Sequence, residues 1–316
     1  MMEGHIAIVG AGLIGRAWAI VFARAGRRVV LHDVAPQALA YALATIRTSV
    51  DDLKAFGRVE EETATVVARV RPEPDLAGAL AGAGYVQECG PEVLEQKRAL
   101  FARLDDLAPD NAVLASSSSG FPTSSFADGL KRRERCLVAH PVNPPYLVPL
   151  VEISPAPFTS PEIVEQAYTL MSEVGQQPIL VEREIDGFIL NRLQGALLNE
   201  AFRLAEDGYA SPDDIDKAVS YGLGLRWSFM GPFETIELNA PGGIADYMRR
   251  YGEMYLAMAK AQADPRPWGP ELVARMEAAR REVLLEDQLS KRQAWRDRRL
   301  MALAAHKREA AKTIQD

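Results

Sequence analysis

The chain has 316 residues, 48% of them hydrophobic and 25% charged, and its formal net charge is −7. This length suits one large or two medium domains, and the composition is that of an ordinary globular protein. The negative charge argues against general nucleic-acid binding, which needs a basic surface. No segment has the roughly 18 consecutive apolar residues of a membrane span, and no signal-peptide layout precedes the first motif, so we expect a cytoplasmic protein. Two cysteines in apolar runs, Cys89 and Cys136, are expected to be buried thiols rather than parts of a disulfide or a metal site.

The stretch HIAIVGAGLIGRAWAIVFARAGRRVVLHD, residues 5–33, holds the most specific motif of the chain. A short apolar run predicts a buried parallel strand, and a helical pattern follows it. Gly10 would permit a tight turn, Gly12 the close approach of a pyrophosphate, and Gly15 close packing of the helix on the strand. Asp33 ends the next strand, where a carboxylate would accept hydrogen bonds from an adenosine ribose and repel a 2′-phosphate. Because all these parts come in order, the stretch predicts an NAD site rather than a glycine-rich turn that only packs.

Strand and helix patterns continue to alternate up to residue 141. Helices are predicted at 36–57 and 92–108, and strands at 66–72, 84–90, 111–119 and 135–141. This alternation predicts an α/β domain over residues 1–186, with a Rossmann-type, mostly parallel sheet and helices on both faces. Ligands of such sheets bind beyond the carboxyl ends of the strands. Glu92, the serines at 116–119 and His140 all follow predicted strand ends, so we expect them on the edge that holds the dinucleotide.

The second half of the chain begins with a proline-rich segment and then turns helical. Residues 141–161 contain seven prolines, with one predicted strand inside LVPLVEIS, and Ser160 with Pro161 is typical of a helix start. Helices are predicted at 187–208, 211–224 and 289–312, which gives an all-α domain over residues 187–316. The last of these helices is basic. We interpret it as a charged helix that closes the fold or borders a dimer, in preference to an anion or partner contact.

The order of these motifs resembles the L-3-hydroxyacyl-CoA dehydrogenase superfamily along nearly the whole chain. The likeness rests on the GxGxxG turn, the strand-end aspartate, QECGPE with a following lysine, the serine cluster, HPVNPP with a following VE, GFILNRL and GPFE. A narrower likeness, to its lambda-crystallin / L-gulonate 3-dehydrogenase branch, rests on AHPVNPPYLVPLVE, GLGLRWSFMGPFETIELNA and RQAWRDRRLMALAAHK. Carnitine dehydrogenases share part of the GLRW–FMGP pattern. The resemblance implies NAD-dependent oxidation of a 3-hydroxyl group by a homodimer.

The resemblance also implies roles for particular residues. His140 would be the general base and Glu152 its partner, while Ser119 and Asn191 would hold the substrate hydroxyl. Asn143 would line the catalytic pocket, and the NAD contacts would come from Leu13, Ile14, Asp33, Glu92, Lys97 and Ser117. The family usually has Asn-Thr-Ser-Ser at the serine cluster, whereas residues 117–120 here are Ser-Ser-Ser-Gly. An amide on the nicotinamide side is therefore missing.

The chemistry of the residues supports a base at His140, although a plain loop histidine is the alternative. Alcohol oxidation needs a group that takes a proton near neutral pH, and histidine does this. A buried Glu152 needs a partner, because an unpaired buried charge is costly. We expect the prolines to form a rigid bend that returns Glu152 to His140. For Asn191 the alternative to a catalytic role is that of a polar residue on the exposed face of a helix.

The substrate is predicted to be a small free 3-hydroxy acid, with L-gulonate as the specific hypothesis. A CoA thioester carries phosphates that need cations, but residues 51–62, in the region that resembles the CoA-contacting segment of the family, are acidic. Arg226 stands among apolar and aromatic residues, where it could clamp a carboxylate or form a salt bridge with Glu234. Two other functions stay open: a 3-hydroxyacyl-CoA dehydrogenase, and a non-catalytic NAD-binding protein of the crystallin kind.

Overall fold

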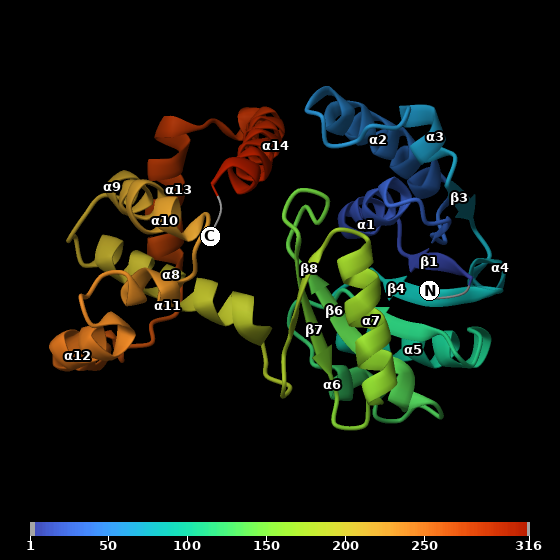
Figure 1. Ribbon diagram of the computed structural model, residues 1–316, viewed down its shortest axis with the longest axis horizontal. Helices are drawn as coiled ribbons and strands as arrows, with labels where there is room; N and C mark the ends of the chain where they lie inside the picture. Colours follow the sequence, from blue (N-terminus) through green and yellow to red (C-terminus); the bar gives the residue numbers. More distant parts are fainter. Residues whose placement is uncertain (1–3, 315–316) are drawn as a thin grey trace. The chain divides into compact units, whose positions relative to one another are not determined.

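The computed structural model describes residues 4–314. In that range an eight-stranded sheet with flanking helices is followed by helices alone (Figure 1). The strands are β1 (His5–Val9), β2 (Val29–His32), β3 (Val70–Glu73), β4 (Ala83–Glu88), β5 (Val113–Ser116), β6 (Cys136–Pro141), β7 (Leu150–Pro155) and β8 (Gln177–Leu180). The helices of this first part are α1 (Leu13–Arg24), α2 (Pro36–Ala55), α3 (Thr63–Val67), α4 (Leu76–Leu80), α5 (Leu94–Leu107), α6 (Thr123–Ala127) and α7 (Pro161–Glu173), with a 3₁₀ turn at Arg133–Arg135.

The sheet confirms the predicted mostly parallel α/β architecture. Its strand order is β3-β2-β1-β4-β5-β6-β7-β8, and every neighbouring pair is parallel except β6 and β7. In that antiparallel pair His140 lies directly opposite Glu152. Directly opposed residues in antiparallel strands have neighbouring side chains on the same face. The register therefore brings the histidine and the glutamate together.

Each face of the sheet is covered by its own hydrophobic core. Successive side chains of a strand point to opposite faces, so β1 sends Ile6 and Ile8 into one core and Ala7 and Val9 into the other. The first core holds α1, α2 and α7, and the second holds α4, α5 and α6. The buried strands read as continuous apolar runs for this reason.

Two stretches of the first part differ from the prediction. The predicted strand at 66–72 is divided, because Val66 is buried as part of α3 and the strand begins only at Val70. The strand β8 was not predicted. It is four residues long and lies at the edge of the sheet, so its residues are partly exposed and lack the apolar run of a buried strand.

The second part is helical, as predicted. Its helices are α8 (Phe188–Glu206), α9 (Pro212–Lys217), α10 (Gly224–Trp227), α11 (Pro232–Glu237), α12 (Gly243–Gln262), α13 (Pro270–Val283) and α14 (Leu289–Thr313), with a π-helical turn at Ala218–Leu223 and a 3₁₀ turn at Glu286–Gln288. The predicted helix at 211–224 is thus α9, the π-helical turn and the start of α10. Ser211 caps α9 by accepting a hydrogen bond from the Asp214 N–H, as expected from its sequence.

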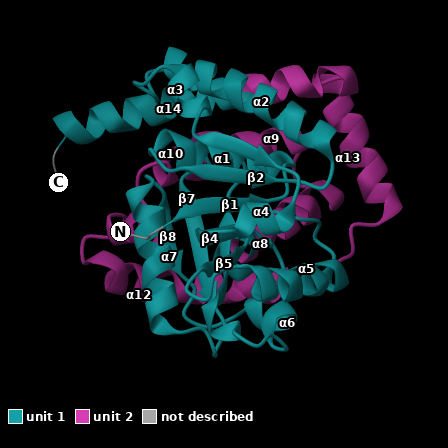
Figure 2. Ribbon diagram, turned by 90° about the vertical axis from the view of Figure 1, so that its right-hand side faces the viewer, with its two compact units in different colours: residues 1–191, 296–316 teal, residues 192–295 magenta. Residues whose placement is uncertain are grey.

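The chain divides into two compact units, which Figure 2 colours separately. Unit 1 comprises Met1–Asn191 and Arg296–Asp316, and unit 2 comprises Arg192–Trp295. The end of α14 therefore returns to unit 1, where Met301 is buried in the first core. None of the helices within residues 4–314 is long and apolar enough to cross a membrane.

Candidate active site

The glycine turn between β1 and α1 has the geometry that its sequence predicts. Gly10 has a φ of +110°, and a Cβ there would lie 2.6 Å from the Cys89 carbonyl oxygen. A Cβ at Gly15 would lie 1.8 Å from the Gly10 carbonyl oxygen. Packing within the protein therefore excludes side chains at both positions. A Cβ at Gly12 would meet no protein atom within 4 Å, so the open space beside it fits the close approach of a pyrophosphate.

The strand-end acid lies beside this turn. Asp33 Oδ2 accepts a 2.9 Å hydrogen bond from the Ala11 N–H, and Oδ1 accepts one of 3.0 Å from Ala35. No side chain caps α1, which leaves N–H groups of its first turn available to phosphate oxygens. In that turn Leu13 is exposed and Ile14 is half-buried. The turn, the helix start and the carboxylate together fit an NAD molecule.

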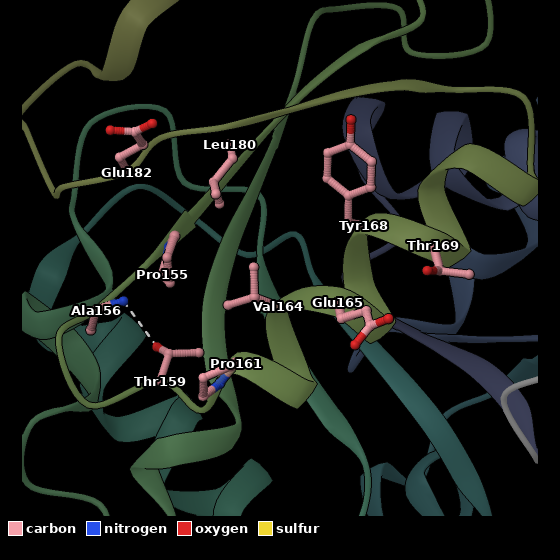
Figure 3. A pocket seen from close by; sticks show the side chains of 10 residues that line it. All are labelled: Pro155, Ala156, Thr159, Pro161, Val164, Glu165, Tyr168, Thr169, Leu180 and Glu182. Atoms are coloured by element: carbon pink, nitrogen blue, oxygen red, sulfur yellow. Dashed lines mark hydrogen bonds between the residues drawn. The ribbon is translucent and has the colours of Figure 1, made fainter.

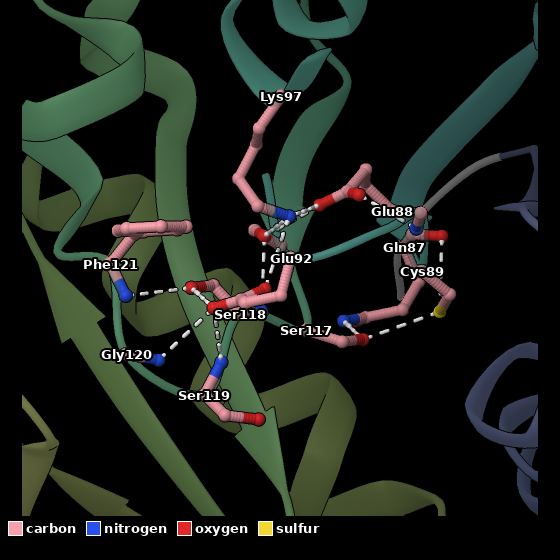
Figure 4. A network of polar contacts seen from close by, with 12 residues as sticks. Gln87, Glu88, Cys89, Glu92, Lys97, Ser117, Ser118, Ser119, Gly120 and Phe121 are labelled. Carbon is pink, nitrogen blue, oxygen red and sulfur yellow. Dashed lines mark hydrogen bonds and ion pairs between the residues drawn. The ribbon is translucent and has the colours of Figure 1, made fainter. Parts of the chain in front are cut away.

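A buried ion pair supports the next part of the sheet edge (Figure 4). Lys97 Nζ lies 2.8 Å from Glu88 Oε2, and both side chains are 1% exposed. Ser116 donates a 2.6 Å hydrogen bond to the same Glu88 oxygen, and Gly90 donates one of 2.7 Å to the other. Lys97 was predicted to contact NAD, but its ammonium group is held beneath the surface, 3.7 Å from Glu92 Oε2.

Glu92 organises the serine cluster that follows β5. Its Oε1 accepts hydrogen bonds from the Ser118 hydroxyl at 2.6 Å and from the backbone N–H groups of Ser119 and Gly120 at 3.0 and 3.1 Å. Ser119 is exposed, and its hydroxyl makes no hydrogen bond within residues 4–314. That hydroxyl is therefore available to a ligand.

Ser117, by contrast, faces the protein. Its hydroxyl accepts hydrogen bonds from Trp18 Nε1 at 3.2 Å and Gln87 Nε2 at 2.7 Å, and the Cys89 thiol lies 3.3 Å away. Burial raises the pKa of the Cys89 thiol, despite the opposing hydrogen bond to Ser117, so this cysteine is a neutral thiol rather than a nucleophile. This network was not predicted from the sequence.

The histidine and the glutamate form the centre of the site. His140 Nδ1 and Glu152 Oε2 are 2.7 Å apart, with exposed fractions of 6% and 0% for the two side chains. A carboxylate can only accept a hydrogen bond, so we assign the proton to Nδ1. Nε2 then keeps its lone pair, and no residue within 4–314 hydrogen-bonds to it. This is the tautomer that a general base requires.

The start of α8 holds the same glutamate from the other side. Glu152 Oε1 accepts hydrogen bonds from the backbone N–H groups of Ile189 and Leu190, at 2.8 and 2.9 Å. In the same helical turn Asn191 Nδ2 donates a 2.9 Å hydrogen bond to the Ser119 carbonyl oxygen. One helical turn therefore joins Glu152 and Ser119, and Asn191 is not merely a solvated residue. The backbone donors have no sequence signature and were not predicted.

Asn143 and Arg226 are the remaining predicted residues of the site. Asn143 is exposed in the loop between β6 and β7, and its peptide bond to Pro144 is cis. Arg226 lies in α10 of unit 2 and is half-buried. Within residues 4–314 Arg226 has no ion pair, so the alternative bridge to Glu234 is not formed. The Tyr255 hydroxyl raises the pKa of Tyr247 in α12, and the positive charge of Arg226 acts in the opposite direction, which relates Arg226 to α12.

A separate groove of about 450 Å³ runs beside α7 and β8 (Figure 3). Apolar side chains such as Val164 and Leu180 line most of it, with Glu165 and Glu182 among the polar ones. None of the predicted site residues lines this groove.

Comparison with known proteins identifies both the sheet-containing part and the helical part of the chain. Residues 5–185 match the NAD binding domain of 3-hydroxyacyl-CoA dehydrogenase, and residues 187–281 match the C-terminal domain of that enzyme. The chain belongs to the 3-hydroxyacyl-CoA dehydrogenase family. This family comprises NAD-dependent oxidoreductases that act on CH–OH groups.

Relatives within the 3-hydroxyacyl-CoA dehydrogenase family point to one branch. The lambda-crystallin homolog of Bos taurus is 45% identical over 310 residues, which are 97% of this chain and 96% of that protein. The L-carnitine dehydrogenase of Nocardiopsis dassonvillei is 37% identical over 95% of this chain and 90% of its own. Among solved structures, the NAD⁺-dependent dismutase 5-formyl-3-hydroxy-2-methylpyridine 4-carboxylic acid 5-dehydrogenase is similar over 96% of this chain and 98% of its own, with a TM-score of 0.83 and 27% identity. The predicted lambda-crystallin branch is confirmed.

Proposed function

We propose that this chain oxidises the 3-hydroxyl group of a small free 3-hydroxy acid with NAD, and that L-gulonate is the first substrate to test. The observation that carries the proposal is the 2.7 Å contact between His140 Nδ1 and Glu152. It leaves the imidazole with one free lone pair at the sheet edge that also holds the glycine turn. The proposed NAD-binding and substrate domains are residues 1–186 and 187–316.

In the proposed reaction His140 Nε2 removes the proton of the substrate hydroxyl. Glu152 holds the imidazole in the required tautomer and stabilises the imidazolium that forms. Ser119 and Asn191 bind the substrate oxygen as its negative charge develops. NAD, when bound, accepts the hydride from the substrate carbon. Gly10, Gly12, Leu13, Ile14, Gly15 and Asp33 would hold the dinucleotide, with Glu92 toward the nicotinamide. Ser117 and Lys97, which face the protein, would support this part of the sheet edge from beneath.

Three observations favour a free acid over a CoA thioester. Arg226 is half-buried and, within residues 4–314, has no carboxylate partner, so we propose that it binds the substrate carboxylate with two hydrogen bonds. We propose further that Asn143 lines the substrate pocket. The segment 51–62 carries five carboxylates against two cations, and Lys54 is already paired with Glu62, so this segment suits CoA phosphates poorly. Two related proteins named above are dehydrogenases of molecules that are not named as CoA thioesters, L-carnitine and a pyridine carboxylic acid.

A 3-hydroxyacyl-CoA dehydrogenase is the second candidate. It is favoured by the similarity to the 3-hydroxybutyryl-CoA dehydrogenase of Escherichia coli, at 32% identity over 75% of this chain. The test is a screen that follows NADH absorbance with L-gulonate, 3-hydroxybutyrate and L-carnitine, and with acetoacetyl-CoA in the reverse direction. We expect turnover of a free acid. Turnover of the thioester alone would overturn the free-acid proposal.

Arg226 gives the screen a matched pair of variants. We expect Arg226→Ala to lower kcat/KM for the free acid by about tenfold or more, because a charged hydrogen bond is worth about 1.5–3 kcal/mol. Arg226→Lys keeps the charge but not the two parallel donors, so it should recover only part of the loss. Equal losses for the free acid and the thioester would assign Arg226 a structural role.

A non-catalytic NAD-binding protein is the third candidate, because the branch includes crystallins. The intact set of His140, Glu152, Ser119 and Asn191 argues against it. NAD binding in calorimetry without turnover of any 3-hydroxy acid would favour it instead.

We also propose that the chain forms a homodimer through unit 2. No residue of α12 is buried, and this helix exposes large apolar side chains: Met248, Tyr251, Met254, Tyr255, Leu256 and Met258. Apolar patches of this kind mark protein interfaces. Light scattering should therefore give a mass of twice 34.6 kDa, and a monomer at micromolar concentration would contradict the proposal.

A further inference from the structure

Phe188 has an unusual backbone conformation at an important place. Its φ is +48°, the only left-handed value of a non-glycine residue within residues 4–314, and it follows Gly187 with a φ of +74°. Bulky L-residues rarely adopt this conformation, because it brings Cβ close to the backbone. A strained residue persists only where the surrounding structure demands it. Phe188 lies where the segment after β8 leads into α8, so the left-handed conformation sets the direction in which α8 begins.

The left-handed pair turns the chain so that the first N–H groups of α8 meet the glutamate of the dyad. Ile189 and Leu190, the two residues after Phe188, donate their backbone N–H groups to Glu152 Oε1. The start of a helix carries a partial positive charge, which stabilises an adjacent carboxylate. The strained turn is thus directly connected to the group that orients His140.

The side chain of Phe188 completes the same arrangement. It is fully buried, and its ring centroid lies 5.4 Å from that of His140 with an interplanar angle of 40°. Glu152 fixes the imidazole only at Nδ1, about which the ring can still tilt. An aromatic ring packed beside the imidazole at this tilted angle limits that freedom. A flexible aliphatic side chain of similar volume would fill the space without defining a plane.

We propose that Phe188 is a positioning residue for the general base: its ring sets the plane of His140, and its left-handed backbone aims the N–H groups of α8 at Glu152. This inference rests on the proposed function, because it assigns His140 as the base. Phe188 acts through His140 and Glu152 rather than on the substrate. The competing explanation is that Phe188 is only a buried aromatic residue of the second core.

Two matched variants separate these explanations. Phe188→Leu keeps an apolar side chain but removes the flat ring. The control is Phe101→Leu, since Phe101 is equally buried in the same core and packs on the ring of Phe126 at 4.4 Å rather than on that of His140. Kinetics with the best substrate of the screen give kcat and both KM values. A histidine-labelled NMR spectrum follows the exchange of the His140 Nδ1–H, which His140→Gln identifies by its disappearance.

We expect Phe188→Leu to lower kcat by about 10- to 100-fold, as small misplacements of catalytic groups do, while both KM values stay within about threefold. The His140 N–H should exchange with water at least about tenfold faster. Phe101→Leu should change the midpoint of unfolding but neither kcat nor the exchange rate. Phe188→Tyr, which keeps the ring, should recover most of kcat.

The outcomes distinguish this inference from the proposed function. If the wild-type chain turns over no 3-hydroxy acid, the proposed function fails, and the exchange rate alone then tests the positioning of His140. If the wild-type chain is active and Phe188→Leu keeps kcat within twofold, Phe188 is not a positioning residue. The same conclusion follows if Phe188→Leu and Phe101→Leu lower kcat equally, or if the His140 N–H exchanges at the wild-type rate in Phe188→Leu.

Discussion

The buried carboxylates of Glu88 and Glu152 have similar hydrogen-bonding patterns, but their side-chain partners are of different kinds. Each has one oxygen bound by backbone N–H groups and the other by a nitrogen-bearing side chain. For Glu88 this partner is the ammonium group of Lys97, which is buried with it. For Glu152 it is His140, whose other nitrogen is open to a ligand. The carboxylate of Glu88 thus stabilises the fold, whereas the carboxylate of Glu152 can support proton transfer.

The backbone around the two carboxylates explains how this difference is maintained. Glu88 receives one backbone N–H, from Gly90, and relies on Lys97 for its countercharge. Glu152 receives two N–H groups from the positive end of α8, which offset part of its charge without any titratable group. The imidazole can therefore gain or lose a proton while the carboxylate stays in place. Variants at the two pairs should accordingly affect different properties.

The largest expected effect is on turnover and comes from the histidine pair. His140→Gln should lower kcat on the order of 10²–10⁴-fold, because it removes the general base. NAD affinity, measured by calorimetry, should stay near the wild-type value, since the glycine turn is unchanged. Activity within a few-fold of wild type would refute the assignment of His140.

A slightly smaller loss of kcat is expected from a substitution of Glu152, the partner of His140. In Glu152→Gln the N–H groups of Ile189 and Leu190 can still bind Oε1, which leaves an amide NH₂ against His140 Nδ1. Nδ1 must then accept, so the proton moves to Nε2 and the base is lost. We expect kcat to fall on the order of 10²-fold or more, with little change in unfolding. If Glu152→Gln lowered the stability but kept kcat, Glu152 would have the structural role that we assign to Glu88.

The lysine pair should respond mainly in stability. Lys97→Met leaves Glu88 as an uncompensated buried charge, which costs about 3–5 kcal/mol in the free energy of unfolding. The double variant Lys97→Met with Glu88→Gln should recover much of that loss in urea denaturation, because no charge is left unpaired. If Lys97→Met and Glu88→Gln each lower the free energy of unfolding by less than about 1 kcal/mol, the Lys97–Glu88 pair does not have this structural role.

The smallest effect is expected at Asp33, a third carboxylate of the same edge that has only backbone partners. Asp33→Ala should raise the KM for NAD by about tenfold, the worth of a charged hydrogen bond, and should relax discrimination against NADP. Asp33→Asn keeps hydrogen-bonding capacity but not the charge, so it should chiefly relax the discrimination. Unchanged kinetics with both cofactors would exclude the ribose contact.

The sequence could predict those parts of the site that depend on residue type at strand ends. The glycine turn, Asp33 and the sheet edge with His140 follow from spacing, and the geometry of Gly10 and Gly15 agrees with it. The proximity of Glu152 was also expected, but from a bend of prolines, whereas antiparallel pairing of β6 with β7 determines it. Strand pairing depends on contacts between distant segments, which a local pattern does not contain.

Other features were beyond prediction for related reasons. The N–H donors of α8 belong to the backbone, so any residue type could supply them. Lys97 was predicted only as an NAD contact, and its buried pairing could not be predicted, because that pairing depends on Glu88 of a neighbouring strand rather than on its own helix. The edge strand β8 is too short and too exposed for its pattern to be distinctive.

The return of α14 to unit 1 has a consequence for the order in which the chain folds during synthesis. Met301 is buried in the first core with Trp18 and Phe22 of α1, although about 280 residues separate them. Domains that form from a continuous segment can fold as soon as that segment leaves the ribosome. The first core of the dinucleotide-binding unit can be completed only after Met301 has emerged. The packing around α1 is thus finished long after α1 itself has been made.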